Sequence, residues 1–235
     1  MISRAVENGV ERFYLPNIDA STLSTLWTLV DQHPKICFPM MGLHPCSVKE
    51  NYKEELELVE IELATGKYFA VGEIGLDLYW DKTTLNDQVD AFRTQVKWAK
   101  QLGLPIVIHA RDAFQEIFKV IDQLNDEKLF GIFHCFTGGR EEAEKIIAFG
   151  GFKMGIGGVV TFKNGGLDKT LADIPIDHLV LETDSPYISP APNRGKRNEP
   201  AYLTFVVEKL ADIYSLSTAE VENITSKNAL EIFKK

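Results

Sequence analysis

Residues 70–77 read Ala-Val-Gly-Glu-Ile-Gly-Leu-Asp, and this apolar run with carboxylates inside it decides the fold class. Three further apolar runs lead into a polar residue in the same way: residues 105–108 into His109, residues 131–133 into His134, and residues 179–183 into Asp184. An isolated charge in an apolar strand is very costly, so each such group needs a partner or a metal ion. The four positions therefore predict one chemical site at the ends of several buried strands.

Seven short apolar runs are typical of strands that are buried on both faces: residues 13–18, 36–43, 68–74, 105–109, 129–134, 151–156 and 178–182. Amphipathic stretches separate them, with apolar residues at helical spacing around residues 89–99, 114–121 and 143–149. Such alternation predicts a parallel sheet that helices cover on both faces. We expect an α/β fold of the (β/α)8 TIM-barrel type.

A closed barrel of this type needs eight strands, whereas the sequence shows seven. The first nine residues are typical of the end of a helix, with Gly9 after its last turn. We therefore expect the first strand to be missing, and residues 1–235 to form a single barrel domain that is N-terminally incomplete. At the other end, residues 217–220 form a capping-box pattern, and Thr225-Ser226 predicts the start of a final short helix at residues 228–233.

Composition limits the class of protein. The chain has 235 residues, 45% of them hydrophobic, and a net charge of −9, which argues against coating duplex DNA by charge neutralisation but not against a nuclease. The three cysteines lack metal-site spacing and are typical of reduced thiols. No apolar run is long enough for a signal peptide or a membrane span, so we expect a cytoplasmic protein without a membrane partner.

Glu73, His109, His134 and Asp184 are the candidate metal ligands. Carboxylates and imidazoles suit a divalent ion that activates water, such as Mg²⁺, Mn²⁺ or Zn²⁺. Asp184 could instead take a proton during the reaction. The alternatives are a structural ion pair at Glu73, a core histidine at His109 and a helix cap at Asp184. Four such residues at strand ends favour the metal site.

Two features predict a substrate that carries phosphate. His44 lies in Gly-Leu-His-Pro, at the end of the run that precedes the strand of Glu73. Basic residues also follow the strands: Arg111, Lys163, and Arg194 and Arg197 within residues 194–197. Because the chain is acidic overall, such clustering suits phosphate oxygens, although charged surface loops are a common alternative. We therefore expect His44, Arg111, Arg194 and Arg197 to bind substrate.

Taken together, the motifs resemble the TatD family of metal-dependent deoxyribonucleases, within the amidohydrolase-like barrels. The resemblance covers nearly the whole chain and is carried by residues 42–45, 71–77, 108–111, 133–138, 181–186 and 192–200. It implies a TatD-like hydrolase domain that holds one or two divalent metal ions and cuts phosphodiester bonds, with single-stranded DNA or DNA ends as substrate. By this resemblance Glu73, His109 and His134 hold one metal, and Glu73 also bridges to a second.

The same resemblance assigns two further roles. Asp184 would bind the second metal and handle the proton, which makes Asp184 and Glu73 the catalytic residues, and His44 and the Arg194 loop would face substrate phosphate. The family's first strand ends in His-x-His and supplies two further ligands, a pair that this sequence does not contain. Two functional alternatives therefore stand beside a deoxyribonuclease: a catalytically impaired barrel that serves as a binding or scaffold protein, and a barrel hydrolase of amides or esters.

Overall fold

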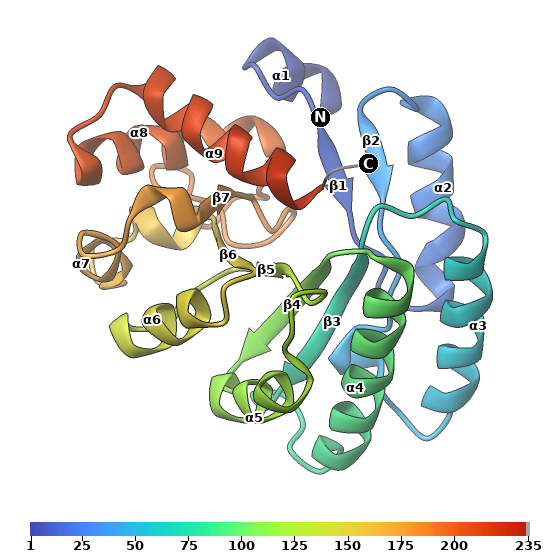
Figure 1. Ribbon diagram of the computed structural model, residues 1–235. Coiled ribbons are helices and arrows are strands. Elements are labelled where there is room, and N and C mark those ends of the chain that lie inside the picture. The colour runs from blue at the N-terminus through green and yellow to red at the C-terminus, as the bar shows by residue number, and fades with distance from the viewer. Residues whose placement is uncertain (234–235) are drawn as a thin grey trace. The chain divides into compact units, whose positions relative to one another are not determined.

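The computed structural model describes residues 1–233, and their contacts divide the chain into two compact units. The N-terminal unit comprises residues 12–132, and the C-terminal unit comprises residues 1–11 and the described residues from 133 onward. Each unit alternates parallel strands with helices (Figure 1).

Parallel strands form the centre of the N-terminal unit. They are β1 (Phe13–Leu15), β2 (Cys37–Pro39), β3 (Val71–Asp77), β4 (Ile106–Arg111) and β5 (Gly131–Phe133), whose last residue begins the C-terminal unit. β1 pairs with β2, a single bridge joins Met41 to Val71, and β3 is followed by β4 and β5. Every residue of β3 is buried, as expected for a strand covered on both faces.

Amphipathic helices cover these strands. They are α2 (Leu23–Gln32), α3 (Tyr52–Ala64), α4 (Leu85–Leu102) and α5 (Phe114–Leu124), with short 3₁₀ turns η1 (Ala20–Thr22) and η2 (Pro45–Ser47). α4 packs on β3 and against α3, which lies beside it in Figure 1. Its buried side chains include Phe92, Val96 and Ala99, at the spacing that places them on one face. The helix stops at Gly103, whose φ of +64° suits a residue without Cβ.

The C-terminal unit contains two strands, β6 (Phe152–Ile156) and β7 (Leu179–Leu181), which pair in parallel. Its helices are α1 (Ile2–Glu7), α6 (Arg140–Ala148), α7 (Leu167–Leu171), α8 (Leu203–Tyr214) and α9 (Thr218–Ile232), with η3 (Gly158–Thr161), η4 (Ile176–His178) and η5 (Pro200–Tyr202). α8 and α9 pack against each other, and α9 also packs on β7. None of the helices within residues 1–233 is long and apolar enough to cross a membrane.

The seven expected strands are all present in the described part of the chain, but their ends differ from the sequence prediction. β3 continues to Asp77, three residues beyond the predicted end, and β1 stops at Leu15. β7 ends at Leu181, so Asp184 lies three residues past the strand rather than closing it. Apolar content predicts where a strand is buried, whereas its ends depend on hydrogen bonds with neighbouring strands.

Predictions for the two chain ends had different outcomes. The predicted N-terminal helix is present as α1, and Gly9 follows its cap Asn8 with a left-handed φ of +88°. The capping box of Ser217 and Glu220 is also confirmed. The separate final helix is wrong, because α9 runs unbroken from Thr218 to Ile232. Thr225 sits inside it and donates its hydroxyl to the carbonyl of Val221, which satisfies a side chain that would otherwise favour a helix start.

Asn228 should be essential for the attachment of α9 to the strand end. Its buried amide nitrogen donates to the carbonyls of Ile176 at 3.0 Å and Leu179 at 2.8 Å. Asn228→Ala would leave two buried carbonyls without this donor, so we expect the free energy of unfolding to fall by about 2 kcal/mol. Urea denaturation measures the change. The exposed neighbour Lys227 provides the control, since Lys227→Ala should change stability little, and equal losses in both variants would contradict this role.

Candidate metal and substrate site

The site in the N-terminal unit is built on two adjacent strands. Gly75 of β3 lies opposite His109 of β4, and a Cβ at Gly75 would come within 2.1 Å of the His109 carbonyl oxygen. Its φ of +142° is also open mainly to glycine. Glycine at this position therefore lets β4 approach β3 closely, and the two strands bring His109 beside Glu73.

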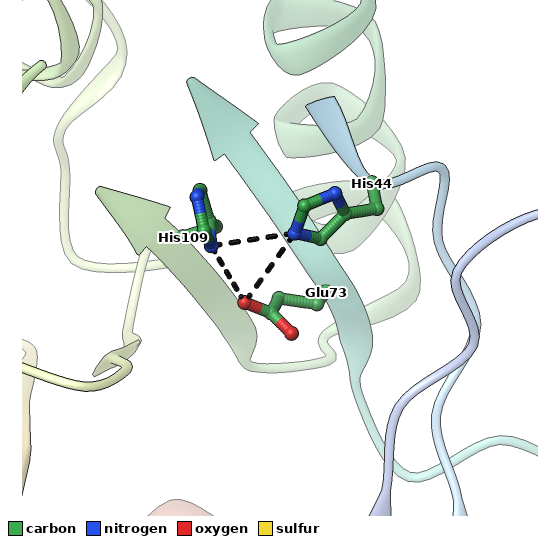
Figure 2. A group of neighbouring side chains, drawn as sticks. All are labelled: His44, Glu73 and His109. Carbon is green, nitrogen blue, oxygen red and sulfur yellow. Dashed lines mark hydrogen bonds and ion pairs between the residues drawn. The ribbon is translucent and has the colours of Figure 1, made fainter. Parts of the chain in front are cut away.

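Three polar side-chain atoms, one from each of Glu73, His109 and His44, lie close together at this point. Glu73 Oε1 lies 3.0 Å from His109 Nδ1 and 3.8 Å from His44 Nε2, and the two ring nitrogens are 3.3 Å apart. Figure 2 shows the two rings and the carboxylate pointing toward one another from β3, β4 and the segment after β2. The Glu73 residue is only 7% exposed, so its charge needs these partners.

His109 lies between two carboxylates. Its Nδ1 faces Glu73 at 3.0 Å, and its Nε2 faces Asp77 Oδ2 at 2.9 Å. Burial alone would lower the pKa of His109, but the hydrogen bonds with Asp77 and Glu73 outweigh burial and raise the pKa above its usual value. Asp77 thus holds the His109 imidazole through Nε2, while Nδ1 points at the Glu73 carboxylate. A positive charge between these two carboxylates is stabilised.

Asp77 holds this arrangement from the end of β3. One of its oxygens accepts from His109, and the other accepts from the backbone N–H groups of Tyr79 at 3.0 Å and Trp80 at 3.1 Å. Burial would raise the pKa of Asp77, yet these hydrogen bonds keep the pKa well below its usual value. The buried Gln88 side chain fixes the Asp77 backbone by accepting from its N–H and donating to its carbonyl.

The tautomer of His44 separates its role from that of His109. The backbone N–H of Cys46 donates to His44 Nδ1 at 3.1 Å, so the neutral ring carries its hydrogen on Nε2. Nε2 is the atom that faces Glu73 and His109. A protonated Nε2 donates hydrogen bonds and does not bind metal, which fits a contact with substrate. The buried Gln95 positions this segment through two hydrogen bonds to the backbone of Leu43.

A second cluster lies in the C-terminal unit. His134 Nδ1 is 2.9 Å from Glu182 Oε2, while His134 Nε2 is 3.5 Å from Asp184 Oδ1. The other oxygen of Glu182 accepts from the backbone N–H of Cys135 at 2.9 Å. Gly155 leaves room for this carboxylate, because a Cβ there would come within 2.0 Å of Glu182 Oε2. Glu182 therefore holds the hydrogen of His134 on Nδ1 and directs the lone pair of Nε2 toward Asp184.

The donor sets of both clusters fit a divalent metal ion. Ligand atoms bound tetrahedrally at about 2.1 Å from an ion lie about 3.4 Å apart. The Glu73–His109 separation of 3.0 Å and the His134–Asp184 separation of 3.5 Å are close to this spacing. In each cluster a second carboxylate, Asp77 or Glu182, binds the opposite nitrogen of the ring. Such carboxylate–histidine pairs are typical of metal ligands because they fix the tautomer and orientation of the ring.

The predicted basic residues are divided between the two units. Arg111 stacks on Tyr79 in the N-terminal unit, with its guanidinium carbon 4.0 Å from the ring centroid. Arg194 lies over Phe162 in the C-terminal unit, at 3.7 Å from the centroid. Arg197 is exposed in the following turn, and Asn198 anchors that turn by donating to the carbonyls of Thr183 and Ile188. The structure therefore connects the Arg194–Arg197 turn to the loop of Asp184.

Two important carboxylates, Asp77 and Glu182, are not among the site residues that the sequence predicts. Both lie in or beside the apolar runs of Glu73 and Asp184. The signal that identified Glu73, a carboxylate among apolar strand residues, applies to both.

Cys46 also lies beside Asp77, where burial and this carboxylate raise the pKa of the thiol to about 12, so the thiol stays protonated.

Parallel β/α units that carry imidazole and carboxylate ligands near strand ends define the class of metal-dependent barrel hydrolases. Comparison with known proteins specifies the family. The family described as TatD related DNase matches residues 1–234, so the chain belongs to this family. It is 36% identical to the uncharacterized metal-dependent hydrolase YabD of Bacillus subtilis, over 100% of this chain and 91% of that protein.

Two further relatives support the same assignment. The chain is 31% identical to the 3'-5' ssDNA/RNA exonuclease TatD of Yersinia pseudotuberculosis, over 100% of this chain and 92% of that protein. The crystal structure of YJJV, a TatD homolog from Escherichia coli K12, superposes with a TM-score of 0.92 at 26% identity and covers 99% of this chain and 90% of that chain. The chain is therefore a metal-dependent hydrolase with an α/β fold of the TIM-barrel type.

Asp77 should control metal affinity without being a ligand itself. Asp77→Asn keeps the shape of the side chain but removes the charge that holds His109 Nε2–H, so we expect divalent metal to bind roughly 10- to 100-fold more weakly. Calorimetric titration with Mn²⁺ or Zn²⁺ measures this change. Asp81→Asn is the matched control, because the Asp81 carboxylate lies in the same loop and accepts its hydrogen bonds from Thr83 rather than from a histidine. Equal affinities for Asp77→Asn and the parent would contradict the assignment.

Metal binding should also strengthen as pH rises. The raised pKa of His109 means that its protonated form persists to higher pH than for an ordinary histidine. A metal on Nδ1 must displace that proton, so affinity is low below the pKa of His109 and increases through it. Titrations in buffers of different ionisation enthalpy measure the protons released. His109→Gln removes the titrating group, and an unchanged pH dependence in that variant would show that another group is responsible.

Proposed function

We propose that this hydrolase cuts phosphodiester bonds in DNA, with single strands or DNA ends as its substrate. One observation carries the proposal: His44 presents an N–H donor 3.8 Å from Glu73 and 3.3 Å from His109, beside two side chains suited to bind metal. A phosphate oxygen is the acceptor that such a donor recognises, and Arg111 adds positive charge two residues beyond His109 on the same strand.

The residues have separate roles in this proposal. Glu73 and His109 would supply metal ligands in one unit, and His134 and Asp184 would do so in the other. A divalent ion at either pair would activate water and stabilise negative charge on the phosphoryl group. Asp184 accepts a proton, for which its position beside His134 is suitable, and Glu73 serves as the second catalytic carboxylate. His44, Arg111, Arg194 and Arg197 bind phosphate.

The choice of nucleic acid has two supports beyond the cluster. The Yersinia relative is named an exonuclease of single-stranded DNA and RNA. Arg111, Arg194 and Arg197 are exposed although the chain carries a net charge of −9. Arg111 and Arg194 both stack on aromatic rings, an arrangement that holds a guanidinium at a fixed position for a phosphate.

We also infer that the protein works in the cytoplasm, in agreement with its three cysteines, which form no disulfide.

Cleavage of labelled single-stranded DNA in the presence of Mg²⁺ or Mn²⁺ tests this function. We expect the parent chain to release shortened products, and Asp184→Asn to lower turnover roughly 100-fold or more, because an amide cannot accept the proton. The variant should remain folded, since Asp184 lies in a loop past β7 and is partly exposed.

Asp212→Asn is the control for this experiment, because it removes an exposed carboxylate from α8 of the same unit. Its turnover should match that of the parent. A parent chain that leaves DNA intact but hydrolyses p-nitrophenyl acetate would replace the proposal with ester hydrolysis. Cleavage by Asp184→Asn at the parental rate would remove the role assigned to Asp184.

A further inference from the structure

The turn after β3 exposes two large aromatic side chains next to the candidate metal site. Tyr79 is 54% exposed and Trp80 is 70% exposed, and their rings meet edge to face with centroids 4.9 Å apart. Single exposed apolar residues are common, but a tryptophan that is mostly in solvent does not contribute much to packing. Two adjacent exposed rings therefore suggest a surface for a ligand with a flat face.

Arg111 completes this surface. Asp77 and Arg111 are partners in the β3–β4 ladder, and the N–H of Leu78 donates to the Arg111 carbonyl at 2.9 Å. The guanidinium lies 4.0 Å from the Tyr79 centroid and 5.4 Å from the Trp80 centroid. Within residues 1–233 no ion pair between Arg111 and a carboxylate is formed. The surface of Tyr79, Trp80 and Arg111, here called the aromatic platform, thus offers ring faces and an unneutralised positive charge together.

Asp77 fixes the distance between the platform and the metal ligands. One oxygen of this carboxylate accepts from the N–H groups of Tyr79 and Trp80, and the other binds His109 Nε2. Asp77 is only 2% exposed, and Gln88 clamps its backbone, so this link is rigid. A ligand on the platform is therefore held at a set distance from His109 and Glu73.

We propose that the aromatic platform stacks a nucleobase of single-stranded nucleic acid, while Arg111 binds the phosphate next to that base. The proposal rests on the phosphodiesterase function above and adds a base-binding subsite to it. Aromatic side chains stack on any base, and arginine pairs with phosphate, so the combination matches single strands, whose bases are accessible. It does not match duplex DNA, where the base faces are covered by their neighbours.

Binding measurements with and without bases test the subsite. Fluorescence anisotropy in EDTA, where metal-dependent cleavage is prevented, compares a thymidine oligonucleotide of about ten nucleotides with a fully abasic strand of equal length and charge. We expect Trp80→Leu to weaken binding of the thymidine strand about 10-fold, and Trp80→Phe to bind it like the parent, because phenylalanine retains a stacking face. Binding of the abasic strand should be the same for both variants and the parent.

Two controls separate stacking from other effects. Ile61→Ala removes an exposed apolar side chain from α3 and should leave both affinities unchanged. Arg111→Gln should weaken binding of both strands and reduce its salt dependence, because it removes a phosphate contact. Thermal melts of all variants confirm that the proteins are folded, as expected for substitutions at exposed positions.

The outcomes distinguish this inference from the function on which it rests. If Trp80→Leu binds the thymidine strand like the parent, or loses equal affinity for the abasic strand, the subsite is wrong while cleavage by the parent still supports the nuclease. If the parent binds the base-containing strand in preference but never cuts DNA, the nuclease is wrong and the subsite stands. A parent chain with no affinity for either strand overturns both.

Discussion

The rest of the site in the N-terminal unit depends on the hydrogen bonds that the buried Asp77 carboxylate accepts. Its two oxygens bind groups of different kinds, the imidazole of His109 and the backbone of the Tyr79–Trp80 turn. A buried charge is tolerated only when its hydrogen-bonding capacity is filled, and here the partners that stabilise it are themselves functional candidates. The orientation of a candidate metal ligand and the shape of an exposed loop are consequently set by one side chain.

A carboxylate that is hydrogen-bonded to a histidine ring occurs in both units. Asp77 binds His109, and Glu182 binds His134, each through the ring nitrogen that faces away from the candidate ligand carboxylate. Imidazole has two similar nitrogens, so a ligand histidine needs a partner that determines which one carries hydrogen. His44 shows the opposite arrangement, since the Cys46 N–H occupies Nδ1 and leaves hydrogen on Nε2. Three histidines of similar exposure thus acquire different chemistry from their neighbours.

Much of the fold could be predicted because buried strands and helix faces require apolar residues at a regular spacing in the sequence. Seven apolar runs became seven strands, and the stretches around Phe92 and Ile117 became helices α4 and α5. The errors concern ends and continuity. Thr225 was read as a helix start although it lies inside α9, because a hydroxyl can either begin a helix or bond to the preceding turn, and packing decides between them. Asp77 and Glu182 carry the same sequence signal as Glu73, a carboxylate among apolar residues, but only the folded chain shows that each one orients a histidine.

The amino-acid sequence is enough to predict the alternation of strands and helices, the resemblance to the family and the candidate ligands Glu73, His109, His134 and Asp184. These follow from apolar periodicity and from short motifs, which are local properties of the chain. The folded chain is needed to show which nitrogen of each histidine faces which carboxylate, and that Arg111 lies on the rings of Tyr79 and Trp80. Such contacts join residues about 30 to 50 positions apart, and they depend on strand register and side-chain direction, which no local pattern encodes.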